Sequence, residues 1–118
     1  MSRNIESITI GLSVNEVQEA ARWYQSLLGK MEAVETAPGA VEFKLCYNVW
    51  LQFDDTGYLE AGGDSSVLRL ETQDIETDYL AVKAIVDDVD DIEEVEGSLK
   101  YFDFKDPYGN RLSFYQLD

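Results

Sequence analysis

The chain has 118 residues, of which 24 are acidic and nine are basic, and its formal net charge is −15. This length suits one compact domain and is too short for two conventional ones. Such a charge repels nucleic-acid phosphates and anionic lipid head groups, and no apolar run approaches the roughly 20 residues that cross a bilayer. We therefore expect neither nucleic acid nor a membrane as a partner.

The N-terminal residues and the cysteine content predict a cytoplasmic protein. Charged and polar residues appear within Met1 to Glu6, before the apolar segment of a secretory signal can develop. The single cysteine, Cys46, has no second thiol with which to form a disulfide or a Cys-x-x-Cys metal or redox pair. Because free cysteines are usually buried, Cys46 is expected to be an interior strand residue.

The first half of the chain predicts a strand, a helix and three further strands. Apolar residues alternate with small or polar ones over 8–14, which is typical of a half-buried strand. Asn15 is a suitable helix N-cap, apolar residues then recur at helical spacing, and Gly29 can end the helix. Further strands are expected at about 31–36, 41–47 and 49–53.

The second half repeats this order after a glycine-, serine- and aspartate-rich segment, 55–66. Residues 67–72 alternate again, and Asp74 can cap a second helix. The side chains expected on the buried face of that helix are Ile75, Tyr79, Val82 and Ile85. The last three strands are expected near 92–96, 99–104 and 111–117. When 9–14 is laid over 67–72 the core-facing positions stay in phase, which predicts two copies of one βαβββ unit.

Two sets of residues resemble the sequence motifs of the vicinal-oxygen-chelate superfamily, which includes glyoxalases, bleomycin-resistance proteins and dioxygenases. The segment Phe104-x-Asp106-Pro107-x-Gly109-Asn110-x-Leu112 is similar to its closing motif. Val14-x-Glu16, Trp23-Tyr24 and Leu28-Gly29 are similar to its opening segment. The resemblance implies an α+β fold, with tandem βαβββ modules at 5–54 and 67–118 joined by linker 55–66 into one domain with a cupped mixed sheet. It also implies a homodimer, in which half-cups complete one another.

The same resemblance places the superfamily's four metal-ligand positions at Thr9, Gln52, Val67 and Ser113. A divalent site of this kind needs imidazole or carboxylate ligands. Val67 cannot coordinate a metal, and the chain has no histidine. We therefore expect no metal and no cofactor, which argues against glyoxalase, dioxygenase and epimerase activity. Because no nucleophile and base pair is recognisable either, no catalytic residue is predicted.

Alternation along the strands predicts which side chains share a face with these four positions. It places the other, core-facing set beneath the helices, and this set includes Ile10, Leu51, Leu68 and Leu112. The predicted ligand-binding residues are Thr9, Gly11, Trp50, Gln52, Val67, Arg69, Glu71, Arg111, Ser113 and Tyr115. Aromatic rings with a few polar groups are what a small-molecule site requires. Two structural alternatives remain open. Trp50 and Tyr115 can instead fill the cup or pack in a dimer, and Arg69 can form an ion pair with Glu71 along one strand.

The leading functional hypothesis is a metal-free homodimeric binding protein that resembles the bleomycin-resistance branch and sequesters a small organic molecule. The net charge favours a cationic ligand and the rings of Trp50 and Tyr115 favour an aromatic one, whereas an Arg69 that is not neutralised by Glu71 favours an anionic one. One alternative is a lyase-like or dioxygenase-like enzyme with an atypical site, and another is a structural or regulatory module with a self-filled cup. The acidic run 87–96 lacks the spacing of a calcium loop and is interpreted as solvated surface.

Overall fold

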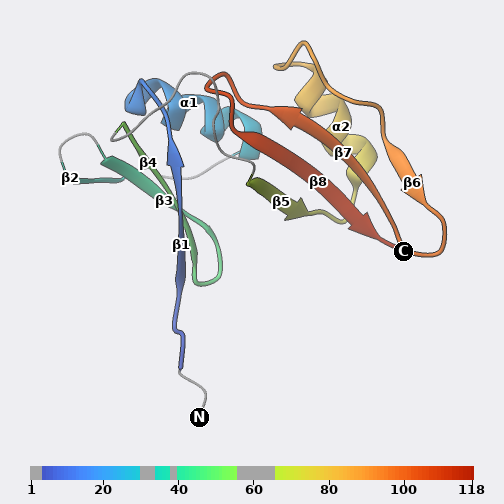
Figure 1. Cartoon of the computed structure of the whole chain (residues 1–118), viewed down its shortest axis with the longest axis horizontal. Helices are drawn as coiled ribbons and strands as arrows, with labels where there is room; N and C mark the ends of the chain where they lie inside the picture. The colour runs from blue at the N-terminus through green and yellow to red at the C-terminus, as the bar shows by residue number, and fades with distance from the viewer. Residues whose placement is uncertain (1–3, 30–33, 38–39, 56–65) are drawn as a thin grey trace. The chain divides into compact units, whose positions relative to one another are not determined.

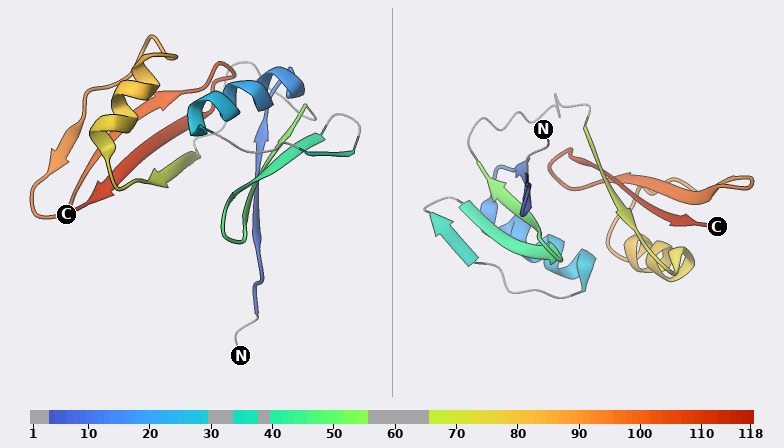
Figure 2. Two further views of the ribbon diagram at one scale, coloured as in Figure 1. Left: turned by 180° about the vertical axis from the view of Figure 1, so that it is seen from behind. Right: turned by 90° about the horizontal axis from the view of Figure 1, so that it is seen from below.

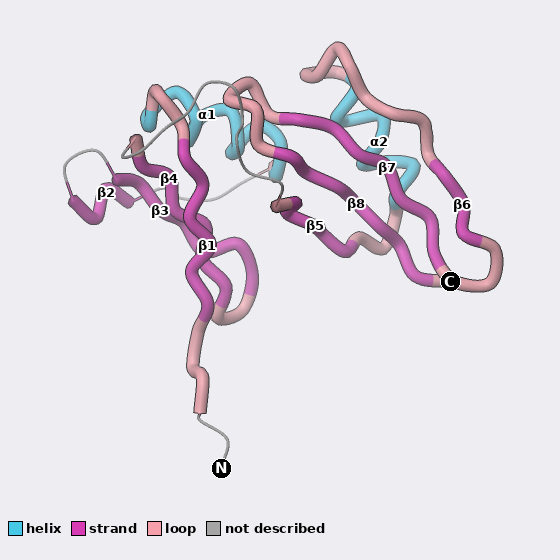
Figure 3. Tube along the Cα trace, viewed as in Figure 1, coloured by secondary structure: helices cyan, strands magenta, loops and turns pink. Residues whose placement is uncertain are grey.

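The computed structural model describes residues 4–29, 34–37, 40–55 and 66–118. It divides into two compact units, Met1–Leu59 and Glu60–Asp118. Each unit contains one helix and one four-stranded sheet, and the two sheets have the same strand order relative to the chain (Figures 1 and 3). The α+β class and the tandem βαβββ repeat are therefore confirmed. Most of the predicted linker, residues 56–65, lies outside the described residues.

The first unit is a mixed sheet with a helix between its first two strands. Its elements are β1 (Ile8–Ser13), α1 (Val17–Leu28), β2 (Val34–Ala37), β3 (Ala40–Cys46) and β4 (Val49–Asp54). The strand order is β1-β4-β3-β2, in which β1 runs parallel to β4 and the other neighbours are antiparallel. The first strand pairs with the last because α1 connects β1 to β2 at the opposite edge of the sheet, and the antiparallel strands β3 and β4 then lead back to β1.

The second unit repeats this arrangement. Its elements are β5 (Val67–Glu71), α2 (Ile75–Lys83), β6 (Glu93–Val95), β7 (Leu99–Lys105) and β8 (Arg111–Leu117). The order is β5-β8-β7-β6, with β5 parallel to β8. Within this unit α2 lies against one face of the sheet (Figure 2). No helix in the described ranges is long and apolar enough to cross a membrane.

Helix α1 buries Val17, Ala20, Ala21 and Tyr24, the helical stripe that the sequence predicts. The Tyr24 ring lies 4.8 Å from the ring of Phe53, which fixes the helix over β4. Gly29 ends the helix in the left-handed conformation, as expected. The predicted cap at Asn15 is wrong, because Glu16 occupies the N-cap position and makes no side-chain cap bond. The start of α1 is thus set by burial of its apolar stripe and not by a capping side chain.

Helix α2 begins as predicted. The Asp74 carboxylate accepts hydrogen bonds from the Thr77 backbone N–H at 3.2 Å and from the Thr77 hydroxyl at 2.7 Å. Ile75 and Val82 are buried, and the Tyr79 ring packs edge-on against Phe102 at 5.2 Å. Ile85 was expected on this buried face, but the helix ends at Lys83 and Ile85 is 41% exposed.

The helix-covered face of each sheet forms its core. In the first unit Ile10 lies beside Leu51, and in the second Leu68 lies beside Leu112. Neighbouring residues in a ladder share a face, so the predicted core-facing positions are confirmed in both units. The largest rings in these cores contact one another: Phe53 lies 5.6 Å from Phe43 in the first unit, and a second stacked cluster in the second unit comprises Phe102, Phe104 and Phe114.

The turn between β7 and β8 is organised by Asp106. One oxygen of this buried carboxylate accepts the backbone N–H groups of Tyr108 and Asn110, each at 2.8 Å. The other accepts the side-chain amide of Asn110, also at 2.8 Å. Gly109 adopts a left-handed φ of 89° that suits glycine. The turn predicted from Pro107, Gly109 and Asn110 is present, and it fixes the register of the two strands that it joins, β7 and β8.

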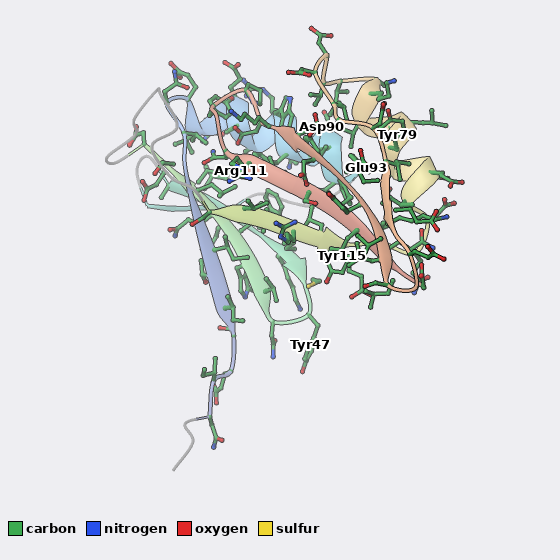
Figure 4. All side chains as sticks on the ribbon, turned by 45° about the vertical axis from the view of Figure 1, so that its right-hand side comes forward. Tyr47, Tyr79, Asp90, Glu93, Arg111 and Tyr115 are labelled. Atoms are coloured by element: carbon green, nitrogen blue, oxygen red, sulfur yellow. The ribbon has the colours of Figure 1, made fainter. Side chains whose placement is uncertain are left out.

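The expected burial of Cys46 is wrong, because the structure places this residue on the surface. Cys46 is the last residue of β3, directly before the turn to β4, and the ladder between the two strands shifts between Lys44 and Cys46. The irregularity breaks the alternation on which the prediction depended. Tyr47, at the tip of the same turn, projects outward and is 83% exposed (Figure 4).

Candidate functional site

The face of each sheet opposite its helix carries the predicted site residues, and we call it the open face. In the second unit the ladders align its side chains in three rows across β5, β8 and β7. The rows are Val67, Arg111 and Lys105; then Arg69, Ser113 and Asp103; then Glu71, Tyr115 and Tyr101. Six of the ten predicted ligand-binding residues therefore meet on this one face. Arg111 and Tyr115 mark its two ends along β8 (Figure 4).

The open face of the second unit differs in charge from the rest of the chain. It holds three of the chain's nine basic residues, Arg69, Lys105 and Arg111, and three of its 24 acidic ones, Glu71, Asp103 and Glu93 of β6. A face with as many basic as acidic residues, on a chain of net charge −15, is much less negative than the chain as a whole. The net charge alone is therefore a poor guide to what this face attracts.

Arg69 and Glu71 do not form the ion pair that was one alternative from the sequence. Glu71 instead accepts a hydrogen bond from the Tyr115 hydroxyl at 3.4 Å, within the same row. In the described part of the chain no carboxylate lies within 4.0 Å of Arg69, which is exposed. The guanidinium is thus available to an acceptor group from outside the protein.

Ser113 and Asp103 form the middle of the face. They are neighbours across β8 and β7, and Ser113 is fully buried, with 0% of its surface exposed. Within the described residues neither the Ser113 hydroxyl oxygen nor one buried carboxylate oxygen of Asp103, Oδ1, has a hydrogen-bond partner. Buried polar atoms nearly always have a hydrogen-bond partner, so these two atoms are exceptions.

The first unit holds the other four predicted residues. Thr9 lies beside Trp50, and Gly11 lies beside Gln52. Gln52 donates to Glu42 of β3 at 3.5 Å, so that the position equivalent to Ser113 is satisfied within the protein. A Cβ atom at Gly11 would have no other atom within 4 Å, so there is open space beside the backbone where the second unit has Arg69. Trp50 is half-buried.

A cavity of about 430 Å³ lies in the second unit. Four of its lining residues belong to the open face: Val67, Asp103, Lys105 and Arg111. The rest of its lining comprises Val86, Asp88, Asp90, Phe104, Asp106 and Leu112. The volume lies within the range of small-molecule sites, and the lining combines apolar side chains with charges of both signs.

Sequence reasoning missed the open-face residues of the third strand in each unit. Asp103, Lys105 and Tyr101 come from β7, and Glu42 comes from β3. The resemblance implies metal positions on the first and last strands of each unit only, so the third strand was not considered. A signal was nevertheless present, because a hairpin turn centred on Pro107 to Gly109 pairs Lys105 with Arg111 and then Asp103 with Ser113.

Comparison with known proteins identifies the fold. No family model and no characterised protein sequence matches the chain. A solved glyoxalase/bleomycin resistance protein from Catenulispora acidiphila is similar over 95% of this chain and 98% of its own, with a TM-score of 0.74 and 18% identity. The chain has the glyoxalase/bleomycin-resistance fold. The resemblance inferred from the sequence motifs is confirmed at this level.

Two further structures show the same glyoxalase/bleomycin-resistance fold. Lactoylglutathione lyase from Agrobacterium tumefaciens covers 92% of this chain and 91% of its own, with a TM-score of 0.71 and 18% identity. The fosfomycin resistance protein FosX from Listeria monocytogenes, solved with Mn(II) and sulfate, covers 98% and 91%, with a TM-score of 0.75 and 14% identity. At such identities the likeness concerns the fold alone.

The residues at the four metal positions that the sequence resemblance implies do not fit a divalent ion. Thr9 and Ser113 offer neutral hydroxyls, Gln52 offers an amide that is bonded to Glu42, and Val67 offers no donor atom. Divalent ions of this class take imidazole, thiolate or carboxylate ligands. Among the described residues no group of three or more histidine, cysteine, aspartate or glutamate side chains is placed to hold a metal.

Proposed function

We propose that this protein binds a small organic molecule on the open face of its second unit, without a metal ion and without catalysing a reaction. The observation that carries the proposal is the cavity of about 430 Å³, whose lining includes four residues of the open face. Its apolar residues, among them Val67 and Val86, can bury the body of a ligand, while Lys105 and Arg111 orient it.

The proposal of a metal-free site rests on the donor chemistry described above. Neutral or apolar side chains at all four metal positions would hold a divalent ion too weakly to retain it. Two of the structurally similar proteins are named for resistance to bleomycin and to fosfomycin, both small molecules. We therefore retain sequestration of a small molecule as the function that the site supports best.

We also propose that two copies associate as a homodimer. Each sheet has two edge strands, β1 and β2 in one and β5 and β6 in the other, and such edges promote association with further strands. Ile8 on β1 is 54% exposed, and Val95 on β6 is 47% exposed, so apolar side chains accompany these edges. Sedimentation at tens of micromolar tests this point, and a monomer at that concentration would contradict it.

The binding proposal is tested by native mass spectrometry of protein purified gently from its own host, followed by a ligand-observed NMR screen of a small-molecule library. We expect a retained or selected organic ligand and less than stoichiometric metal by elemental analysis. Stoichiometric zinc, nickel, manganese or iron that is lost on substituting any two of the four metal positions would refute the metal-free site. Failure of every library compound to bind would refute the binding function.

A further inference from the structure

The unpartnered pair in the middle of the open face indicates the kind of ligand group that completes it. Ser113 is fully buried, its hydroxyl oxygen has no partner among the described residues, and its neighbour Asp103 has a buried carboxylate oxygen in the same condition. A carboxylate oxygen only accepts hydrogen bonds, whereas a hydroxyl can both donate and accept. One group that carries several N–H donors can therefore satisfy both atoms at once.

The equivalent place in the first unit shows what a satisfied pair looks like. Glu42 and Gln52 occupy the same ladder positions there, and the Gln52 amide donates to the Glu42 carboxylate at 3.5 Å. The glutamine supplies the N–H group that serine lacks at Ser113. The Ser113 hydroxyl can donate, but it makes no hydrogen bond to Asp103, so the acceptor of the second unit stays unsatisfied although the two halves share one backbone arrangement.

Charged groups of both signs surround this pair, because the cavity that Asp103 lines also contains Asp88, Asp90 and Asp106 besides two cations. Along the strands the next row contains Lys105 and Arg111, which line the same cavity as Asp103, and across the sheet Arg69 lies beside Ser113. Within the described residues Lys105 and Arg69 form no ion pair. Successive residues on one strand face are about 7 Å apart, and the lysine and arginine side chains are long enough to shorten that separation.

We propose that the ligand is zwitterionic, with a protonated primary amine held by Asp103 and Ser113 and a carboxylate held by Lys105 and Arg111. This inference rests on the proposed function and names the ligand class of the same site. The amine donates to the two unpartnered oxygens, and the carboxylate accepts from the two cations of the neighbouring row. Val67, Val86 and Leu112 line the same cavity and cover an apolar side chain of the ligand.

Three matched probes test the two ends of the site separately. Phenylalanine carries both charged groups, 2-phenylethylamine carries only the amine, and 3-phenylpropanoate carries only the carboxylate. Their affinities are measured by NMR titration of the whole chain, in which the amide signals of β7 and β8 report the place of binding. We expect phenylalanine to bind at least about tenfold more tightly than either analogue, because each loses one charge-assisted interaction.

Substitutions assign each end to its residues. Asp103→Asn should weaken phenylalanine and 2-phenylethylamine by about tenfold and leave 3-phenylpropanoate within twofold. Lys105→Met should weaken phenylalanine and 3-phenylpropanoate by about tenfold and leave 2-phenylethylamine within twofold. Asp87→Asn, the same chemical change at an exposed residue outside the cavity lining, should alter none of the three affinities. Should Asp103→Asn prove poorly folded, Ser113→Ala replaces it and should selectively weaken the two amines.

Each outcome separates this inference from the proposed function. If 3-phenylpropanoate binds as tightly as phenylalanine, or if Asp103→Asn weakens all three probes equally, the amine assignment is wrong although a binding site exists. If none of the three binds at millimolar concentration while the library screen finds another ligand, the zwitterion proposal falls and the binding function stands. If nothing binds in either experiment, both fall.

Discussion

Replacing Ser113 by alanine should make the ligand-free protein more stable, although serine lies in the proposed site. The Ser113 side chain is fully buried and its hydroxyl has no hydrogen-bond partner among the described residues. Burying a hydroxyl without a partner costs about 1–3 kcal/mol. Removing the oxygen leaves a void of about 10 Å³, which at about 24 cal/mol per Å³ offsets only about 0.2 kcal/mol. We therefore expect Ser113→Ala to raise the free energy of unfolding by about 1–2 kcal/mol.

The assay has to report on the second unit. Both tryptophans, Trp23 and Trp50, belong to the first unit, so tryptophan fluorescence is a poor monitor of this change. Amide hydrogen exchange of β7 and β8, with far-UV circular dichroism during urea denaturation, measures the stability of the relevant sheet. Ser98→Ala, at an exposed turn residue of the same unit, is the control and should stay within about 0.5 kcal/mol of the parent.

The opposite result would refute the reasoning. If Ser113→Ala lowers the stability by 1 kcal/mol or more, the hydroxyl has a partner in solution, such as a buried water that bridges it to Asp103. The pair would then be complete without a ligand. A stabilised Ser113→Ala variant with weakened amine binding would instead show that the parent chain sacrifices stability at this position for recognition.

Three further predictions concern the core, the cap of α2 and the β7–β8 turn. Phe53→Ala, which removes a fully buried ring, should lower the free energy of unfolding measured by urea denaturation by about 3–5 kcal/mol. Trp50→Ala, which truncates a half-buried ring on the open face, should lower it by less than half as much. Equal losses would place Trp50 in the core. Hydrogen bonds from the Thr77 side chain and then its backbone lower the pKa of Asp74, so the cap stabilises fully above the ordinary carboxyl value of about 3.9 and is lost as the pH falls through the lowered folded pKa. Acid unfolding of Asp74→Asn should therefore depend less on pH than that of the parent, and an unchanged profile would exclude this contribution. Asp106→Ala, which leaves two backbone N–H groups of the turn without their acceptor, should cost about 3 kcal/mol and speed amide exchange at the start of β8, and a smaller loss would show that water replaces the carboxylate.

Much of the fold was predictable because local patterns and tertiary packing agree. Alternation in 8–14 and 67–72 placed Ile10 and Leu68 on the helix-covered face, and Asp74 caps α2 as its residue type suggests. The errors occur where a nearby constraint overrides the local preference. Asn15 is a better cap than Glu16 in isolation, yet burial of the α1 stripe sets the start of the helix one residue later.

The candidate site was only partly predictable. Alternation finds the face on which Arg69, Ser113 and Tyr115 lie, because it needs no knowledge of strand neighbours. The positions of Asp103 and Lys105 beside them depend on the register of β7 against β8, which the Asp106 turn sets. The unpartnered state of the Ser113 hydroxyl depends on atomic packing that no sequence pattern encodes.

The position of β8 inside its sheet has a consequence for the order in which the chain acquires structure. β8 is hydrogen-bonded on both sides, to β5 and to β7, although it is the last strand of its unit to be synthesised. β5 therefore emerges from the ribosome without a neighbour, and its ladder with β8 can form only after α2, β6, β7 and β8 have been synthesised. The first unit meets the same delay earlier, and it is complete once Asp54 has been made. The pairing of the first strand with the last therefore occurs at different times in the two units. The first sheet can be complete before the strands of the second are available to compete for its edges.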